Sequence, residues 1–259
     1  MALLQAERMS VAFGGVQALV DVSFDVHEGE VFSIIGPNGA GKTTIFNCIS
    51  RFYNLDRGVI RVKGKDISRV SPHAMAEMGV ARTFQNIELF KKMTVIDNLM
   101  LGRHRSKRSN LVSEALFIGS VKRAEIRSRE KAEEVIDFLD LQAYRTQQVK
   151  NLPYGIQKTV ELGRALAMDP EVLLLDEPSS GLNMEETEDL AFWLTDIKEA
   201  LGITIVMVEH NIKLVQDITD RVLALNFGAV ITLGAAQDVL GDPEVIRAYL
   251  GEESDFASS

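Results

Sequence analysis

The sequence contains very little cysteine and tryptophan, with one of each among 259 residues. The single thiol, Cys48, excludes an internal disulfide and is typical of a reducing compartment. No uninterrupted apolar run approaches the ~20 residues that a membrane-spanning helix needs. The start of the chain, MALLQAERMS, lacks the basic and apolar regions of a secretory signal. These absences predict a cytoplasmic protein that does not itself cross a membrane.

Positive charge is also in short supply. Lysine and arginine number 28 against 37 acidic residues, which gives a formal net charge of −9. Proteins that bind nucleic-acid backbones draw their affinity from Lys and Arg, so we expect no nucleic-acid partner. The charge is unevenly distributed. Residues 103–131 hold nine basic and three acidic side chains, so the rest of the chain carries a net charge of −15. That segment is either a solvated helical face or a surface for anionic lipid headgroups or for acidic loops of a partner protein.

What the chain does have is the composition of a globular protein, 46% hydrophobic and 25% charged. Residues 20–26 alternate between apolar and polar, which predicts a half-buried strand antiparallel to another over 3–13. The apolar runs 31–36, 172–176 and 203–210 are continuous, as expected of parallel strands covered on both faces. Between the last two runs we expect a helix that begins at Asn183 and ends at Gly202. The pattern is that of an α/β protein.

Two further features complete the predicted organisation. Near the C-terminus, the apolar stretches 222–225 and 229–233 flank Asn-Phe-Gly and predict a hairpin. From about 85 to 152 the pattern is helical, with one apolar face formed by Ala132, Val135, Ile136 and Leu139. We therefore expect a helical lobe inserted into an α/β core.

The segment GPNGAGKT (36–43) matches the phosphate-loop pattern G-x-x-x-x-G-K-[ST] between a strand and a helix. Its glycines let backbone N–H groups converge on phosphate oxygens, and the helix N-terminus adds its dipole. Lys42 is expected to reach the β- and γ-phosphates, and the Thr43 hydroxyl to bind Mg²⁺. The alternative is a glycine-rich turn without a ligand. The residues predicted to contact ATP here are Gly36, Pro37, Asn38, Gly39, Ala40, Gly41, Lys42, Thr43 and Thr44.

The strand VLLLDEP (172–178) ends in two carboxylates. Asp176 is placed to help hold Mg²⁺ at the carboxyl edge of the sheet. Glu177 points elsewhere and could take a proton from the water that attacks the γ-phosphate. Alone, the pair could be an acidic strand end before a turn at Pro178, but together with the phosphate loop it predicts binding of a nucleoside triphosphate.

Ahead of that strand, NLPYGIQKTVELGRALAMDP (151–170) resembles the signature segment of ABC ATPases, and the other motifs of that family are present along the chain in the family's order. The resemblance implies that Phe13 stacks on adenine, that Gln85 joins the core to the helical lobe and contacts Mg²⁺, and that His210 helps Glu177 hold the attacking water. Taken alone, these three could be a core aromatic, a solvated glutamine and an ordinary strand-end histidine. The signature residues are Leu152, Pro153, Tyr154, Gly155 and Ile156. The D-loop residues are Ser180, Gly181, Leu182 and Asn183.

The same resemblance implies the fold: a P-loop NTPase core with a mainly parallel sheet, N-terminal antiparallel strands and an inserted α-helical subdomain. On this chain that means one domain, 1–259, with a core of 1–85 and 161–259 and a helical subdomain of 86–160. Two ATPase subunits would pair head to tail and enclose two ATP molecules, each between one subunit's phosphate loop and the other's signature. ATP-driven closure would then drive membrane-embedded permeases.

This sequence departs from the family pattern at two points. The usual signature is L-S-G-G-Q, and Pro153 offers neither the serine hydroxyl nor an N–H. Asn183 stands where many members have Asp. Our hypothesis is that the ATP site completed by this signature is the weaker of the two in a dimer.

Within the family, several segments resemble the ATPase subunits of branched-chain amino-acid importers: the basic insert, the LPYG signature, EHNIKLV (209–215) and the ending DPEVIRAYLGEE (242–253). Such importers combine two different ATPases, two permeases and an external binding protein, with the ATPases at the cytoplasmic face of the membrane. Similar ATPases serve amide, urea and aromatic-acid importers. The other classes that we weigh are a soluble ABC-type ATPase in DNA repair or translation and a small-molecule kinase; the single cassette argues against the first, and the signature and His210 against the second.

Overall fold

The computed structural model describes residues 2–83, 87–103 and 118–256, with backbone only for 118–124 and 250–256. The chain forms two compact units, 1–85 with 171–259, and 86–170. The expected boundary at residue 160 needs correction, because it falls inside the continuous helix α6 (Tyr154–Leu166) and the second unit extends to Pro170.

The first unit contains an antiparallel sheet of four strands, as the alternating pattern near the N-terminus predicts. Val22, Phe24 and Val26 are buried on one face, and the strand that carries them pairs antiparallel with its predecessor. The strands, in the order β2-β1-β4-β5, are β1 (Ala2–Phe13), β2 (Val16–His27), β4 (Arg57–Val62) and β5 (Lys65–Asp66).

The second sheet of this unit has six strands in the order β10-β9-β3-β8-β7-β6. Its continuous apolar runs are fully buried and pair in parallel, whereas β9 and β10 form the predicted hairpin. The strands are β3 (Val31–Ile35), β6 (Val80–Arg82), β7 (Val172–Asp176), β8 (Thr204–Val208), β9 (Arg221–Asn226) and β10 (Ala229–Ala235).

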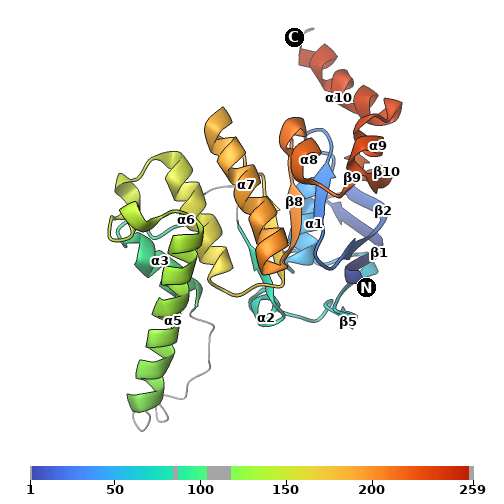
Figure 1. The fold of residues 1–259 in the computed structure, drawn as a ribbon. Helices are drawn as coiled ribbons and strands as arrows, with labels where there is room; N and C mark the ends of the chain where they lie inside the picture. The colour runs from blue at the N-terminus through green and yellow to red at the C-terminus, as the bar shows by residue number, and fades with distance from the viewer. Residues whose placement is uncertain (1, 84–86, 104–117, 257–259) are drawn as a thin grey trace. The chain divides into compact units, whose positions relative to one another are not determined.

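Helices cover both faces of this parallel sheet (Figure 1). Helix α1 contacts both β2 and β7 and so lies between the two sheets, while α7 packs on β8 and α8. Asn183 caps α7 and Gly202, in the left-handed conformation, ends it, as the sequence predicts. The helices are α1 (Lys42–Ile49), α2 (Pro72–Glu77), α7 (Met184–Leu201), α8 (Ile212–Ile218), α9 (Ala236–Leu240) and α10 (Pro243–Phe256).

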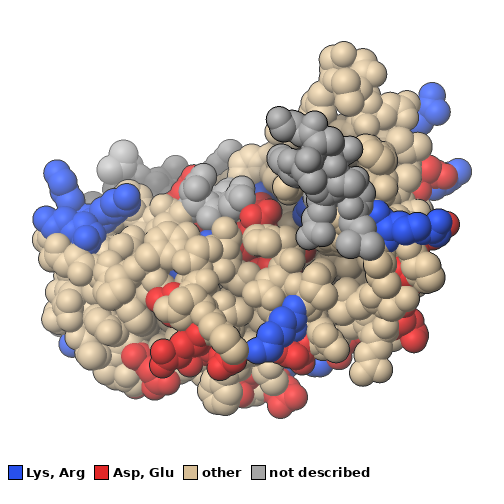
Figure 2. Space-filling view, turned by 90° about the horizontal axis from the view of Figure 1, so that it is seen from above, with Lys and Arg blue, Asp and Glu red and all other residues tan. Residues whose placement is uncertain are grey.

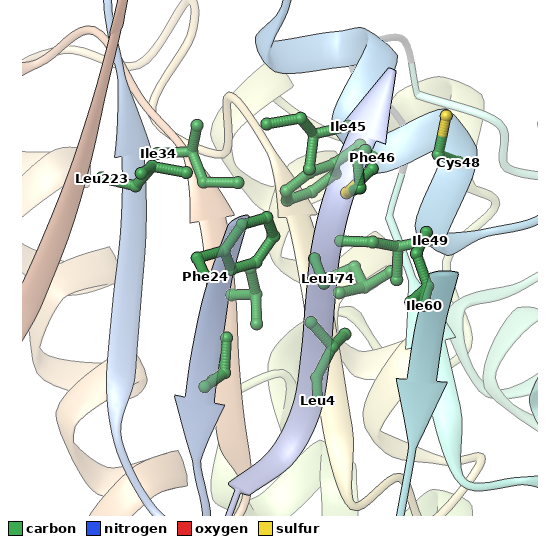
Figure 3. Close-up of a cluster of buried hydrophobic side chains, with 14 of the residues drawn as sticks. Leu4, Phe24, Ile34, Ile45, Phe46, Cys48, Ile49, Ile60, Leu174 and Leu223 are labelled. Carbon is green, nitrogen blue, oxygen red and sulfur yellow. The ribbon is translucent and has the colours of Figure 1, made fainter. Parts of the chain in front are cut away.

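The hydrophobic core of this unit fills the space between the two sheets around α1 (Figure 3). Leu4 and Phe24 reach it from the antiparallel sheet, Leu174 from the parallel sheet and Phe46 from α1. Cys48 is fully buried among them, and burial raises the pKa of its thiol to about 11. The cysteine is therefore an inert core residue.

The second unit is helical in the part that the structure describes. Ala132, Val135, Ile136 and Leu139 are buried, which confirms the predicted helix face. Helix α6 packs against α3 and α5. The elements are α3 (Val95–Gly102), α5 (Ile118–Phe138), α6 (Tyr154–Leu166) and the short 3₁₀ turns η1 (Gln142–Tyr144) and η2 (Val149–Asn151).

Charge on the surface follows the acidic balance of the sequence. In the view of Figure 2, acidic side chains gather along the lower margin. Most of the basic segment 103–131 lies outside the described residues or carries no described side chains. None of the helices in the described part of the chain is long and apolar enough to span a bilayer.

Candidate nucleotide-binding site

The phosphate loop leaves β3 at Gly36 and enters α1 at Lys42. Two of its glycines have positive φ and are closely surrounded by backbone. A Cβ on Gly36 would lie 2.3 Å from the Leu225 carbonyl oxygen, and one on Gly41 would lie 2.7 Å from that of Ala18. Only glycine fits both positions, so the loop is pressed firmly against β2 and β9.

Lys42 is buried, with only 7% of its surface exposed. Its Nζ donates to the carbonyl oxygens of Gly36 at 2.6 Å and Pro37 at 2.9 Å, so the ammonium lies inside the curve of the loop. Helix α1 has no acidic residue in its first turn, and its N-cap, Gly41, makes no side-chain hydrogen bond to the first N–H groups. A helix start of this kind, with a cation beside it, is suited to an anion such as a phosphate.

Asp176 lies at the end of β7, only 4% exposed, and its Oδ2 accepts a hydrogen bond from Arg82 Nη2 at 2.7 Å. Sequence analysis did not single out Arg82. Its Nη1 also donates to Asn47 Oδ1 and Ser50 Oγ, which ties the end of β7 to α1 and the residues that follow it. A single arginine at the end of a three-residue strand gives no sequence signal for this role.

Glu177 directly follows and differs from Asp176 in conformation. Its φ is +48°, unusual for a residue other than glycine, and its N–H donates to the Val208 carbonyl at 2.9 Å. This turn brings the Glu177 carboxylate within 3.8 Å of His210 Nδ1. The two residues that the sequence pairs as base and partner therefore lie side by side at the sheet edge, and a strained backbone of this kind is often found at functional sites.

Glu209, between β8 and His210, is a second residue that sequence analysis missed. It is completely buried, and its carboxylate accepts hydrogen bonds from the N–H and Oγ of Ser179 at 2.8 and 3.0 Å. The same carboxylate accepts from the N–H groups of His210 and Asn211 at 3.0 and 3.2 Å. Glu209 thus joins the turn that carries His210 to Ser179, the residue directly before the D-loop. In the sequence, Glu209 is only a charged residue at the end of the apolar run 203–210, and nothing in the pattern predicts that its side chain is buried.

The D-loop, 180–183, leads directly into α7. Asn183 accepts from the Glu186 N–H, and Glu186 accepts from the Asn183 N–H, which makes a complete capping box. Asn183 therefore has a structural task in addition to any contact with ATP, and Asp could perform the capping equally well.

Phe13 ends β1 and is 46% exposed, so it is not the core aromatic of the alternative interpretation. Its ring and the Tyr53 ring form a T-shaped pair, with an interplanar angle of 64° and a centroid distance of 5.0 Å. An exposed aromatic face of this kind can stack on a base. Gln85 lies outside the described residues, which resume after it at residue 87.

The signature segment begins α6 in the second unit. Leu152 and Gly155 are buried, whereas Pro153 and Tyr154 are exposed. Pro153 is the N-cap of α6 and makes no side-chain hydrogen bond to the helix, unlike the caps Thr94 of α3 and Asn183 of α7. Pro153 itself thus offers the start of α6 no side-chain acceptor, whereas a serine at this position could.

The chain is similar to known proteins along almost its whole length. Residues 19–180 match the family described as ABC transporter, and residues 229–255 match the branched-chain amino acid ATP-binding cassette transporter family. The chain is 38% identical over 250 residues to the high-affinity branched-chain amino acid transport ATP-binding protein LivG of Salmonella typhimurium, which covers 96% of this chain and 98% of the relative.

Two further matches have the same extent. BraF of Pseudomonas aeruginosa, with the same description as LivG, is 37% identical over 250 residues, 96% of this chain and 98% of its own. A crystal structure of the ADP conformation of an ATP-binding cassette of an ABC transporter superimposes with a TM-score of 0.84 at 33% identity, covering 97% of this chain and 99% of that one. The chain belongs to the ABC transporter family of ATP-binding proteins.

Proposed function

We propose that this chain is the ATP-binding and ATP-hydrolysing subunit of an importer for branched-chain or other hydrophobic amino acids. The observation that carries the proposal is the match to LivG over almost the whole of both chains, together with the match of residues 229–255 to the branched-chain family. The alternatives are importers for amides, urea or aromatic acids; no described feature favours them.

The geometry supports a specific mode of ATP binding. Phe13 offers an exposed ring for adenine, and the N–H groups of the loop and of the start of α1 bind the phosphates. Lys42 would exchange its bonds to the Gly36 and Pro37 carbonyls for bonds to the β- and γ-phosphates. That exchange replaces neutral acceptors by charged ones, so phosphate binding is favoured.

Hydrolysis would use the pair at the ends of β7 and β8. Glu177 accepts a proton from the attacking water, and His210, 3.8 Å away, orients that water and the γ-phosphate. Glu209 fixes the turn that carries His210. Gln85 is proposed to sense the same phosphate and to contact Mg²⁺, as the family resemblance implies.

The oxygen donors present fit Mg²⁺, which binds through one or two protein oxygens together with phosphates and water. The Thr43 hydroxyl and the Asp176 carboxylate would hold it, and Arg82 connects Asp176 to α1, the helix that carries Thr43. Bound there, the ion would neutralise charge that develops on the phosphates.

Partners follow from the same proposal. The exposed start of α6 at Pro153 and Tyr154 is offered to the ATP of a second ATPase subunit, identical or different. Two integral-membrane permeases would bind the pair at the cytoplasmic face of the cell membrane, with an external binding protein beyond them. Because ATP favours the closed pair, its γ-phosphate supplies the differential affinity that such a switch requires.

The direct test of the mechanism is Glu177→Gln. We expect phosphate release to fall at least about hundredfold, while binding of a fluorescent ATP analogue is kept, because only the proton acceptor is lost. Glu199→Gln on the exposed side of α7 is the matched control. A Glu177→Gln subunit that hydrolyses ATP at the wild-type rate would exclude Glu177 as the base.

The transport role has its own test. Affinity purification of the tagged chain from membranes of its natural host should recover two multi-span permeases and a second ATPase. Recovery of the chain alone, or of a soluble partner, would contradict the importer.

A further inference from the structure

The phosphate loop has a hydrogen-bond partner 213 residues further along the chain. The Gly36 N–H donates to Tyr249 Oη at 2.8 Å. Tyr249 lies in α10, within the segment 229–255 that matches the branched-chain family and beyond the segment 19–180 that matches ABC transporters in general. A helix near the end of the chain therefore contacts the first residue of the loop expected to bind ATP.

The start of α10 explains how Tyr249 reaches this position. Asp242 Oδ1 accepts from the Glu244 N–H at 2.7 Å, directly at Pro243, the first residue of the helix. Val245 is buried at 3% exposure and so attaches the first turn to the rest of the unit. Residues four apart share a helix face, and Tyr249 accordingly points inward on the same side as Val245.

The Cα, the carbonyl oxygen and the N–H of Gly36 all have close neighbours in the structure. The Leu225 carbonyl leaves no room for a Cβ, Lys42 Nζ donates to the Gly36 carbonyl oxygen, and Tyr249 accepts from the Gly36 N–H. When Lys42 turns toward phosphates, its bond to Gly36 is given up. The Tyr249 bond does not compete with phosphate and can persist throughout.

We propose that Tyr249 is a positioning residue for ATP binding, through which the C-terminal helix of this branch holds the phosphate loop in its binding shape. The proposal rests on the chain's function as an ATP-binding subunit. Loss of the hydroxyl leaves the N–H of the buried Gly36 without this acceptor and lets the loop adopt other shapes, so part of the free energy of ATP binding is then spent on ordering the loop.

The test is Tyr249→Phe, which removes the hydroxyl and keeps the ring. We expect the Kd for a fluorescent ATP analogue to rise about tenfold, equivalent to ~1.4 kcal/mol. Hydrogen exchange at the Gly36 amide should become faster in the absence of nucleotide. In the ATPase assay of the assembled transporter, KM should rise while kcat stays within about twofold, because Glu177 and His210 are untouched. Tyr144→Phe, in the second unit, is the matched control and should change none of these.

Each outcome has a separate meaning. Wild-type chain that fails to bind the analogue contradicts the proposed function itself. Wild-type chain that binds, with Tyr249→Phe equal to it in Kd and in Gly36 exchange, overturns the role of Tyr249. Faster exchange throughout β7 and β8 together with a lower kcat would indicate general loosening and would also overturn it.

Discussion

The phosphate loop and the signature segment both lie at the start of a helix, yet their surroundings are opposite. The phosphate loop is packed between backbone carbonyls, and the charged groups near it are buried and paired, as in Arg82 with Asp176. The signature segment begins α6 with two exposed residues, Pro153 and Tyr154, and no capping side chain. Under the proposed function, the packed phosphate loop is the chain's own half of an ATP site, and the exposed start of α6 is the half that serves a partner subunit.

The largest effect that tests this contrast is expected from Arg82→Met. The change leaves Asp176 as a buried carboxylate without its cation, which costs about 3–5 kcal/mol of unfolding free energy. Urea denaturation measures the loss, and Mg²⁺ with ATP should narrow the gap to wild type, because Asp176 is one of the residues proposed to hold the metal. Arg61→Met, which removes an exposed pair with Glu7, should cost less than about 1 kcal/mol. Equal losses of unfolding free energy in Arg82→Met and Arg61→Met would contradict the expectation that the buried ion pair matters more than the exposed one.

Glu209→Gln should have the next largest effect. An amide in place of the carboxylate turns one acceptor oxygen into a donor group that faces backbone N–H groups, so we expect a loss of about 2–3 kcal/mol in the same denaturation experiment. ATPase activity should fall as well, since the turn with His210 loses its support. Glu188→Gln, an exposed partner of Lys213, is the control. A Glu209→Gln variant as stable as wild type would show that the hydrogen bonds of the buried carboxylate do not stabilise the fold.

Sequence reasoning reached most of the fold because strand burial and loop chemistry are local. The continuous apolar runs predicted the parallel strands, and the positions of Asn183 and Gly202 predicted both ends of α7. The boundary at 160 failed because a continuous helix carries no compositional break. At the site, the motifs paired Glu177 with His210, and the two side chains lie 3.8 Å apart, while their roles in hydrolysis stay a prediction.

The supporting residues could not be predicted in the same way. Arg82, Glu209 and Tyr249 acquire their roles through contacts with distant segments, and each belongs to a residue type that is ordinary at its position. An arginine after a short strand or a tyrosine in a terminal helix has no local pattern that reports its partner. Only the folded arrangement brings them to the phosphate loop and the sheet edge.

A smaller effect is expected from Pro153→Ser in the exposed signature segment. Serine supplies an N-cap oxygen for α6, which should stabilise the second unit by up to about 1 kcal/mol. Because the hydroxyl could also reach the partner's γ-phosphate, the ATPase rate of the assembled complex should rise. Pro153→Ala removes the ring without adding the hydroxyl and should not raise the rate. An unchanged rate with Pro153→Ser would contradict the hypothesis that this signature weakens its ATP site.

The smallest effect concerns a charged cluster of the second unit, where Asp169 pairs with Arg103 and with Lys131. Burial alone would raise the pKa of Asp169, but the hydrogen bonds and charges of Lys131 and Arg103 outweigh it and lower the pKa below its usual 3.8. A lowered folded-state pKa means that the pair stabilises the unit above the unfolded pKa and that this contribution disappears as pH falls through the folded value. The Asp169 side chain is 51% exposed, so solvent keeps the contribution small. We therefore expect Asp169→Asn to lower the thermal midpoint slightly at pH 7 and to lose this difference as the pH falls through the lowered folded-state pKa of Asp169. A difference in thermal midpoint that persists unchanged to acid pH would mean that Asp169 stabilises the unit through packing and not through its charge. The contrast between weak surface charges in the helical unit and strong buried charges near the phosphate loop would then not hold.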